Sequence, residues 1–126
     1  MSKRETPLIR KYWSQVGGTL IEEFQAVKRS DDNSPRYIDA IIIPSGERKI
    51  AKTSEVSLEG KDIICIQAKH SRLGMYLMGQ TLFSKQLLQK FKPKSILSVA
   101  LCTKDDSVLR PLLESYPGMK VVIIQE

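Results

Sequence analysis

The chain has 126 residues, enough for a single domain over residues 1–126 with a real hydrophobic core, and no linker-like stretch divides it. A composition of 41% hydrophobic and 27% charged residues is that of a globular protein and excludes a low-complexity chain. Twenty Lys and Arg against fourteen Asp and Glu give a formal charge of +6. This balance makes nucleic acid a natural partner, although a solvated basic surface explains it equally well.

The first part of the chain predicts a helix followed by two strands. Apolar residues at helical spacing favour a helix from about residue 7 to residue 23, interrupted by a pair of glycines. Residues 24–29 (FQAVKR) and 36–44 (RYIDAIIIP) have the composition of strands. The turn-forming residues between them, 30–35 (SDDNSP), indicate that the two strands pair as an antiparallel hairpin.

The middle of the chain predicts a loop, a buried strand and a long helix. Residues 45–60 are mostly polar and favour a surface loop that carries at most a small irregular strand. Residues 62–69 (DIICIQAK) form a nearly continuous apolar run, typical of a strand covered on both faces. Residues 72–91 have apolar side chains at helical intervals and stop before a proline, which predicts a helix.

The last part predicts two further strands joined by a short helix. Residues 95–103 (SILSVALCT) favour a buried strand, 105–118 a short helix with an Asp cap, and 119–126 (MKVVIIQE) a final strand. Strand–helix–strand units of these lengths indicate right-handed parallel crossovers. The predicted order is therefore αβββαβαβ, an α/β fold with a mixed central sheet flanked by helices.

Three polar side chains stand out within or at the end of these apolar strands. Asp39 interrupts YIDAIII, while Gln67 and Lys69 lie two residues apart and so share a face of their strand. Strand pairing brings Asp39 beside them, and such a cluster suits phosphodiester hydrolysis, in which oxygen ligands hold a divalent cation and a lysine stabilises charge. By spacing alone, an ordinary ion pair between Asp39 and Lys69 explains the same residues more simply.

The order of elements and these residues resemble the restriction-endonuclease-like, or PD-(D/E)xK, nuclease superfamily, whose core runs helix, three-stranded meander, helix, strand. The resemblance covers nearly the whole chain, from the Glu22-Glu23 pair through RYIDAIII to IQAKH and the next helix. It implies an (endo)deoxyribonuclease that depends on Mg²⁺ or Mn²⁺. The site that it implies consists of the strand acid Asp39, the third-strand residues Gln67 and Lys69, and a first-helix acid, Glu23 in preference to Glu22.

The sequence departs from that family at one position, because Gln67 stands where Glu or Asp is usual. A neutral amide offers a metal one carbonyl oxygen, so the metal affinity should be lower. We expect an active site in which a glutamate supplies the missing charge. The alternative is a weakened nuclease-fold module that binds nucleic acid or a protein without cutting, and a protein-interaction domain without a nucleic-acid role is a third reading.

Several other residues are candidates for contacts to nucleic acid. The resemblance implies a helix Gln that contacts the site or the substrate, and Gln80 occupies that helix, although filling a packing gap suits it equally well. Arg36, Arg72 and Lys85 are candidate phosphate contacts. His70 should point to the face opposite Lys69 and is interpreted as a structural or surface residue, not a catalytic one.

The remaining expectations concern cofactors, compartment and assembly. The sequence has no Gly-rich phosphate loop, dinucleotide fingerprint or Cys/His metal spacing, which argues against a nucleotide cofactor or zinc. It has no run of about 18 apolar residues and no signal-peptide pattern, so a cytoplasmic protein without a membrane partner is expected, with both cysteines reduced. A homodimer through the last strand or the helix at residues 73–91 is a further expectation.

Overall fold

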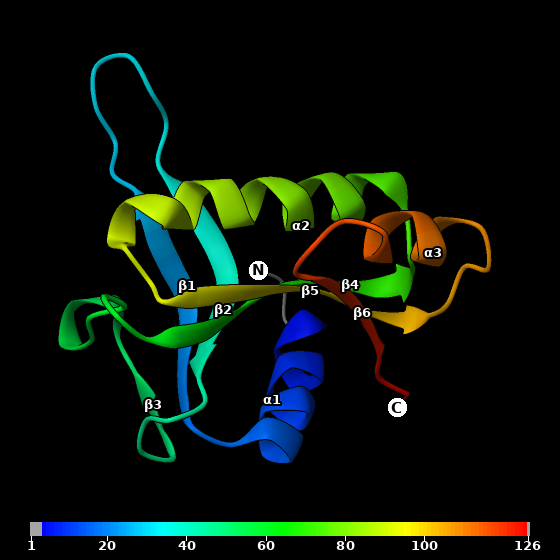
Figure 1. Ribbon diagram of the computed structural model, residues 1–126, viewed down its shortest axis with the longest axis horizontal. Coiled ribbons are helices and arrows are strands. Elements are labelled where there is room, and N and C mark those ends of the chain that lie inside the picture. The colour runs from blue at the N-terminus through cyan, green and yellow to red at the C-terminus, as the bar shows by residue number, and fades with distance from the viewer. Residues whose placement is uncertain (1–3, 126) are drawn as a thin grey trace.

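A mixed sheet of six strands forms the centre of the molecule, in the order β3-β1-β2-β4-β5-β6 (Figure 1). The computed structural model describes residues 4–125. Its strands are β1 Thr19–Val27, β2 Arg36–Ile43, β3 Lys49–Ala51, β4 Asp62–Arg72, β5 Ser95–Lys104 and β6 Met119–Ile123. Its helices are α1 Glu5–Val16, α2 Met75–Leu88 and α3 Leu109–Glu114, with single-turn 3-10 helices η1 Thr53–Glu55 and η2 Gln89–Phe91. The predicted α/β class with a mixed, helix-flanked sheet is confirmed.

The first helix starts earlier and ends sooner than the sequence predicts. Gly17 and Gly18 take φ values of +81° and +79°, which L side chains rarely adopt, so α1 ends at Val16. The Gly17 N–H closes the last turn by donating to the carbonyl of Trp13 at 2.7 Å. The chain from Thr19 onward pairs with β2. The prediction of a helix up to residue 23 is therefore wrong, and its last residues belong to strand β1.

The remaining elements follow the predicted order with one addition. β1 and β2 form the expected antiparallel hairpin, and the polar 45–60 segment contains β3, which pairs parallel with β1. The pairs β4–β5 and β5–β6, joined through α2 and α3, are both parallel as predicted. The expected Asp cap is Asp106, whose Oδ1 accepts the N–H groups of Val108 and Leu109 before α3. The order is thus the predicted one with a short strand inserted before β4.

The sheet is covered on both faces. Figure 1 shows α1 on one face and α2 with α3 on the other. The α1-side core includes Leu8, Ile9 and Tyr12 of the helix, packed with Leu20, Ala40, Ile42, Ile64, Ile66, Ala68, Val99 and Leu101 of the sheet. The α2-side core includes Ile21, Phe24, Ile38, Ile41, Cys65, Leu77, Leu88, Ala100 and Cys102. Burial on both faces explains why the central strands are almost continuously apolar.

Both cysteines are buried and free, as predicted. Burial raises the pKa of the Cys65 thiol to about 12, and the pKa of Cys102 is also raised, mainly by burial. Because the thiolate is the reactive form, these cysteines act as small apolar residues. Within the described residues, no helix has the length and apolar character needed to cross a membrane.

We predict that Gly18→Ala destabilises the protein far more than Gly60→Ala. Both glycines have a positive φ, but a Cβ at Gly18 would lie 2.2 Å from the Ile43 carbonyl oxygen, whereas nothing lies within 4 Å of one at Gly60. The positive φ alone costs an alanine about 1–2 kcal/mol. The clash with backbone should add at least roughly 1–3 kcal/mol for Gly18→Ala. Urea unfolding measures the free energy of unfolding of both variants. An equal decrease in the two would contradict the close approach of Gly18 to the Ile43 backbone.

Candidate active site

The ladder between β2 and β4 stops within the sheet, and the predicted site lies at that point. The two strands pair antiparallel as far as Ala40 and Ile66. The same register would set Asp39 opposite Gln67, but the described strands form no ladder pair there. On the other side of β2, Glu23 of β1 has a φ of 52° and is skipped in the β1–β2 register. Asp39 therefore lies where β2 lacks ladder partners on both sides.

The strands also change the face that they present at this point. Residues two apart on a regular strand share a face, yet Ala40 packs in the α1-side core and Ile38 in the α2-side core. An irregularity of this kind bends a strand and re-aims its side chains. Glu23 and Asp39 occupy the crossing, and neither side chain belongs to a core cluster.

The Asp39 carboxylate replaces a missing partner of the backbone. Its Oδ2 accepts the N–H of Ala68 on β4 at 2.9 Å. Desolvation raises the pKa of Asp39 above its ordinary value, the bond from Ala68 opposes this shift, and the charges of Glu5 and Glu23 raise the pKa further. Acidic side chains from α1, β1 and β2 thus act on one another at the opening of the sheet.

Glu5 is a candidate site residue that the sequence prediction missed. It lies in the first turn of α1 and is only 9% exposed, which is unusual for a glutamate. The predicted helix began at residue 7, which left Glu5 outside it. The sequence does hold a signal, because an acidic residue just before Thr6-Pro7 suits the first turn of a helix. Its approach to Asp39 depends on how α1 packs across the sheet.

Gln67 and Lys69 share the α2-side face of β4, as predicted. Gln67 is 5% exposed, and its Nε2 donates to Ser84 Oγ of α2 at 2.7 Å. Lys69 is exposed and lines a surface pocket with residues of α2. Among the described residues no ion pair joins Lys69 to Asp39. The simpler reading of the sequence, an Asp39–Lys69 ion pair, is therefore wrong, and the lysine ammonium is available to a ligand.

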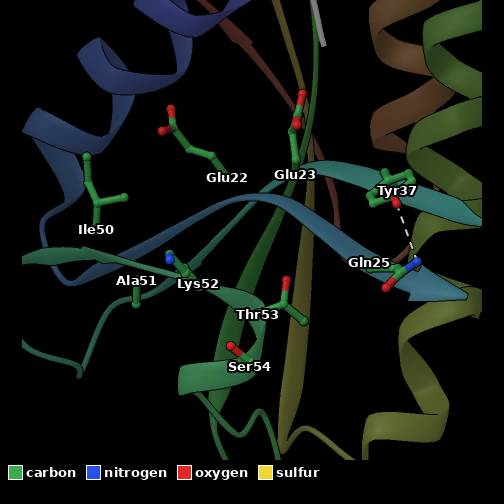
Figure 2. Close-up of a pocket in the computed structure, with 9 residues that line it drawn as sticks. All are labelled: Glu22, Glu23, Gln25, Tyr37, Ile50, Ala51, Lys52, Thr53 and Ser54. Carbon is green, nitrogen blue, oxygen red and sulfur yellow. Dashed lines mark hydrogen bonds between the residues drawn. The ribbon is translucent and has the colours of Figure 1, made fainter. Parts of the chain in front are cut away.

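The two glutamates predicted on the first helix lie instead on β1, because the glycine pair ends that helix. Glu22 forms an ion pair with Arg10 of α1 at 2.9 Å. Glu23 is exposed and contributes its charge to the surroundings of Asp39. Both line a surface pocket of about 510 Å³ beside β3 and η1 (Figure 2). Glu23 thus remains a candidate site acid, while Glu22 is held by Arg10.

The predicted nucleic-acid contacts separate into two groups. Arg72 and Gln80 line the same pocket as Lys69, a cavity of about 130 Å³ that also includes Tyr76. Arg36 lies with the hairpin-turn residues 29–34. Lys85 is farther along α2, where its Nζ donates to the carbonyl of Pro117. The structure therefore groups only Arg72 and Gln80 with the proposed catalytic lysine.

His70 lies on the face opposite Lys69, as predicted, and its Nδ1 is 2.9 Å from Arg4 Nη2.

The aromatic residues of α1 contribute to the packing of the fold. Tyr12 is buried in the α1-side core, and Trp13 packs against that core while its Nε1 donates to the Gly18 carbonyl at 2.8 Å.

The donor atoms at the opening fit a hard divalent cation. Carboxylate and amide oxygens are the ligands that Mg²⁺ and Mn²⁺ prefer. Burial and, to a smaller extent, repulsion from Glu5 and Glu23 raise the pKa of Asp39, and a bound cation would oppose both effects. Within residues 4–125 no three His, Cys, Asp or Glu side chains converge as a metal-binding group. A cation at the opening would therefore rely on Asp39 and one glutamate, Glu5 or Glu23, while the Gln67 amide oxygen would have to approach from the α2 side of β4.

Comparison with known proteins gives no relatives: no family model matches the chain, and no significant match to a curated protein or to a solved structure was found.

We predict that Asp39→Asn stabilises the protein at pH 7. The folded-state pKa of Asp39 is raised, so its contribution to stability is fully present below its unfolded pKa of about 3.9 and is lost as the pH rises through the folded pKa. Asparagine removes this ionisation cost and can still accept the Ala68 N–H. Urea unfolding at pH 7 should show a higher midpoint for the variant, with the difference disappearing near about pH 3.

Asp39→Ala is the matched control, because it removes both the charge and the acceptor. It should be less stable than Asp39→Asn by about 1–3 kcal/mol, the usual cost of an unsatisfied buried N–H. If Asp39→Asn is less stable than the wild type at pH 7, the prediction that ionised Asp39 destabilises the folded protein through desolvation is wrong.

Proposed function

We propose that the protein is a divalent-metal-dependent nuclease that hydrolyses phosphodiester bonds, with DNA as the substrate. One observation carries the proposal: the β2–β4 ladder stops beside Asp39, whose Oδ2 accepts the N–H of Ala68, the residue between Gln67 and Lys69, and no ion pair joins Asp39 to Lys69 among the described residues. A largely buried acid with a raised pKa is more typical of a functional site than of a structural pair, and the exposed Lys69 lies on the neighbouring strand.

The roles of the residues follow from their chemistry. Asp39, Gln67 through its amide oxygen, and Glu5 or Glu23 would hold Mg²⁺ or Mn²⁺. When bound, such a cation polarises the phosphodiester and lowers the pKa of a water ligand. Lys69 stabilises the negative charge that develops on the attacked phosphate, because its exposed ammonium faces the same side of β4 as Gln67.

Features beside the site support a polyanionic substrate. The chain carries a net charge of +6, which attracts nucleic acid from solution. The pocket next to Lys69 offers the cation of Arg72, the amide of Gln80 and the ring of Tyr76, which is 81% exposed. Arg is suited to phosphate, and an exposed aromatic ring is suited to stacking on a base. These groups would position the strand on the Lys69 side of the scissile bond.

We predict that the purified protein cleaves DNA in the presence of Mg²⁺ or Mn²⁺ and that EDTA abolishes the cleavage. Asp39→Asn and Lys69→Ala should each lower the rate by at least about 100-fold, the usual effect of removing an essential charged group. End-labelled single-stranded, duplex and branched DNA, together with RNA, are the substrates to test. If all of them stay intact with both metals, the catalytic proposal fails.

Matched variants separate a local effect from a general loss of charge. Lys120→Ala removes an exposed lysine from the distant strand β6 and should leave the rate unchanged. Glu5→Gln and Glu23→Gln test which glutamate takes part. Glu22→Gln is their control, because this carboxylate is already paired with Arg10. A loss confined to Glu22→Gln would contradict the placement of the site.

A second candidate function is a binding module that keeps this fold without cutting. It is favoured by the neutral, buried Gln67 and by the lack, within the described chain, of three acidic side chains gathered for a metal. If the module binds DNA with an affinity that falls as the salt concentration rises, its partner is nucleic acid. If it binds no DNA, or binds it with an affinity that salt does not change, a protein partner is favoured.

Gln67→Glu distinguishes a nuclease from such a module. Under the nuclease proposal the new carboxylate adds to the negative charge around Asp39, so the metal-free variant is less stable and Mn²⁺ binds about 10-fold more tightly. The thermal midpoint should therefore rise more with Mn²⁺ than it does for the wild type, with cleavage retained or increased. No Mn²⁺-dependent shift and no cleavage in either protein would support the non-cutting module.

A further inference from the structure

Gln67 is held from α2 by a serine whose own proton is already engaged. Ser84 Oγ is 2.6 Å from the carbonyl oxygen of Gln80, one turn earlier in the helix, and a carbonyl can only accept. A hydroxyl has one proton to donate, so Ser84 must act as the acceptor toward Gln67. The Gln67 atom 2.7 Å from Ser84 Oγ is therefore the amide nitrogen.

This bond determines which end of the Gln67 amide is presented to the site. Among the described residues Oε1 accepts no hydrogen bond, and no fully buried side-chain oxygen or nitrogen there lacks a partner. Oε1 therefore keeps some contact with solvent and contributes to the 5% of Gln67 that is exposed. A flipped amide would present N–H donors instead, and these repel a cation.

We infer that Ser84 is a positioning residue that fixes the Gln67 amide with its oxygen toward the metal. This inference rests on the proposed function, because it assigns Ser84 a role in the same site. The effect resembles that of the hydrogen-bond partners behind metal ligands, which orient the ligand without touching the metal. It also explains how a neutral amide serves at this position, since only one of its two orientations can ligate.

The chain offers a close control in Ser98 of β5. Its hydroxyl donates to the carbonyl of Thr81 in α2 at 2.7 Å, and Ser98 is as deeply buried as Ser84. Ser98 forms no hydrogen bond with Gln67 among the described residues. Ser84→Ala and Ser98→Ala therefore each remove a buried hydroxyl that bonds to an α2 carbonyl, but only the first releases the Gln67 amide.

The first measurement is made without metal, by NMR of the Gln67 side-chain NH₂, which is identified by its loss in Gln67→Ala. In the wild type and in Ser98→Ala this NH₂ should exchange slowly with water, and in Ser84→Ala the protection should be lost. Unchanged protection in Ser84→Ala would overturn the inference, because the amide would then be held by something other than Ser84.

The second measurement is Mn²⁺ affinity. Ser84→Ala should weaken binding by about 10-fold, while Ser98→Ala changes it little. In a Gln67→Ala background Ser84→Ala should have no further effect, since it acts only through Gln67. If Ser84→Ala lowers the Mn²⁺ affinity equally in the wild-type and Gln67→Ala proteins, Ser84 acts through the general packing of α2, and its role in positioning Gln67 is overturned.

The two measurements distinguish a failure of the proposed function from a failure of the inference about Ser84. A wild-type protein that binds no Mn²⁺ overturns the metal site and, with it, this role of Ser84. Mn²⁺ binding that Ser84→Ala leaves unchanged overturns the role of Ser84 alone.

Discussion

The hydrogen bond from the Ala68 N–H to Asp39 Oδ2 is the interaction on which the site depends. Backbone N–H groups inside a protein must find acceptors, and a strand that leaves a ladder normally loses them. Here β2 parts from β4 after the Ala40–Ile66 pair, and the Asp39 side chain supplies the acceptor that the strand no longer provides. The sheet can therefore open without an orphaned donor, and the carboxylate is fixed at the opening.

The same arrangement places a cost on the fold. Asp39 is desolvated and near other acids, so its ionisation is disfavoured, which is typical of groups kept for function and not for stability. A carboxylate in place of Gln67, at a position only 5% exposed, would add another desolvated charge. A neutral amide at this position avoids that cost, and under the proposed function it would do so at the expense of weaker metal ligation. Under that proposal, Gln67 is a compromise between the stability of the metal-free protein and its affinity for the metal.

The sequence predicted the parts of the site that follow from local periodicity. The period of two along a strand puts Gln67 and Lys69 on one face and His70 on the other, and the hairpin signals put Asp39 on the neighbouring strand. This was enough to place these residues on two neighbouring strands but not to resolve their contacts.

The sequence predictions were wrong or incomplete in two situations. In one, a local sequence feature allowed two interpretations; in the other, a contact joined residues far apart in the sequence. The glycine pair was interpreted as an interruption of a helix, although two positive φ values end it, and this misplaced Glu22 and Glu23. Glu5 and Ser84 could not be assigned from periodicity, because their contacts join residues far apart in the sequence. The family resemblance supplied the idea of a first-helix acid, but only the packing of α1 across the sheet brings Glu5 to Asp39.

Helix α2 connects the site to the core. Apolar packing alone tolerates some sliding of a helix over a sheet, whereas buried polar contacts allow fewer positions. Two such contacts join α2 to the sheet, from Gln67 to Ser84 and from Ser98 to the Thr81 carbonyl. The same helix brings Gln80 beside Lys69. Because these side chains are set by one rigid element and not by loops, any shift of α2 would alter the orientation of Gln67 and the pocket at Lys69 together.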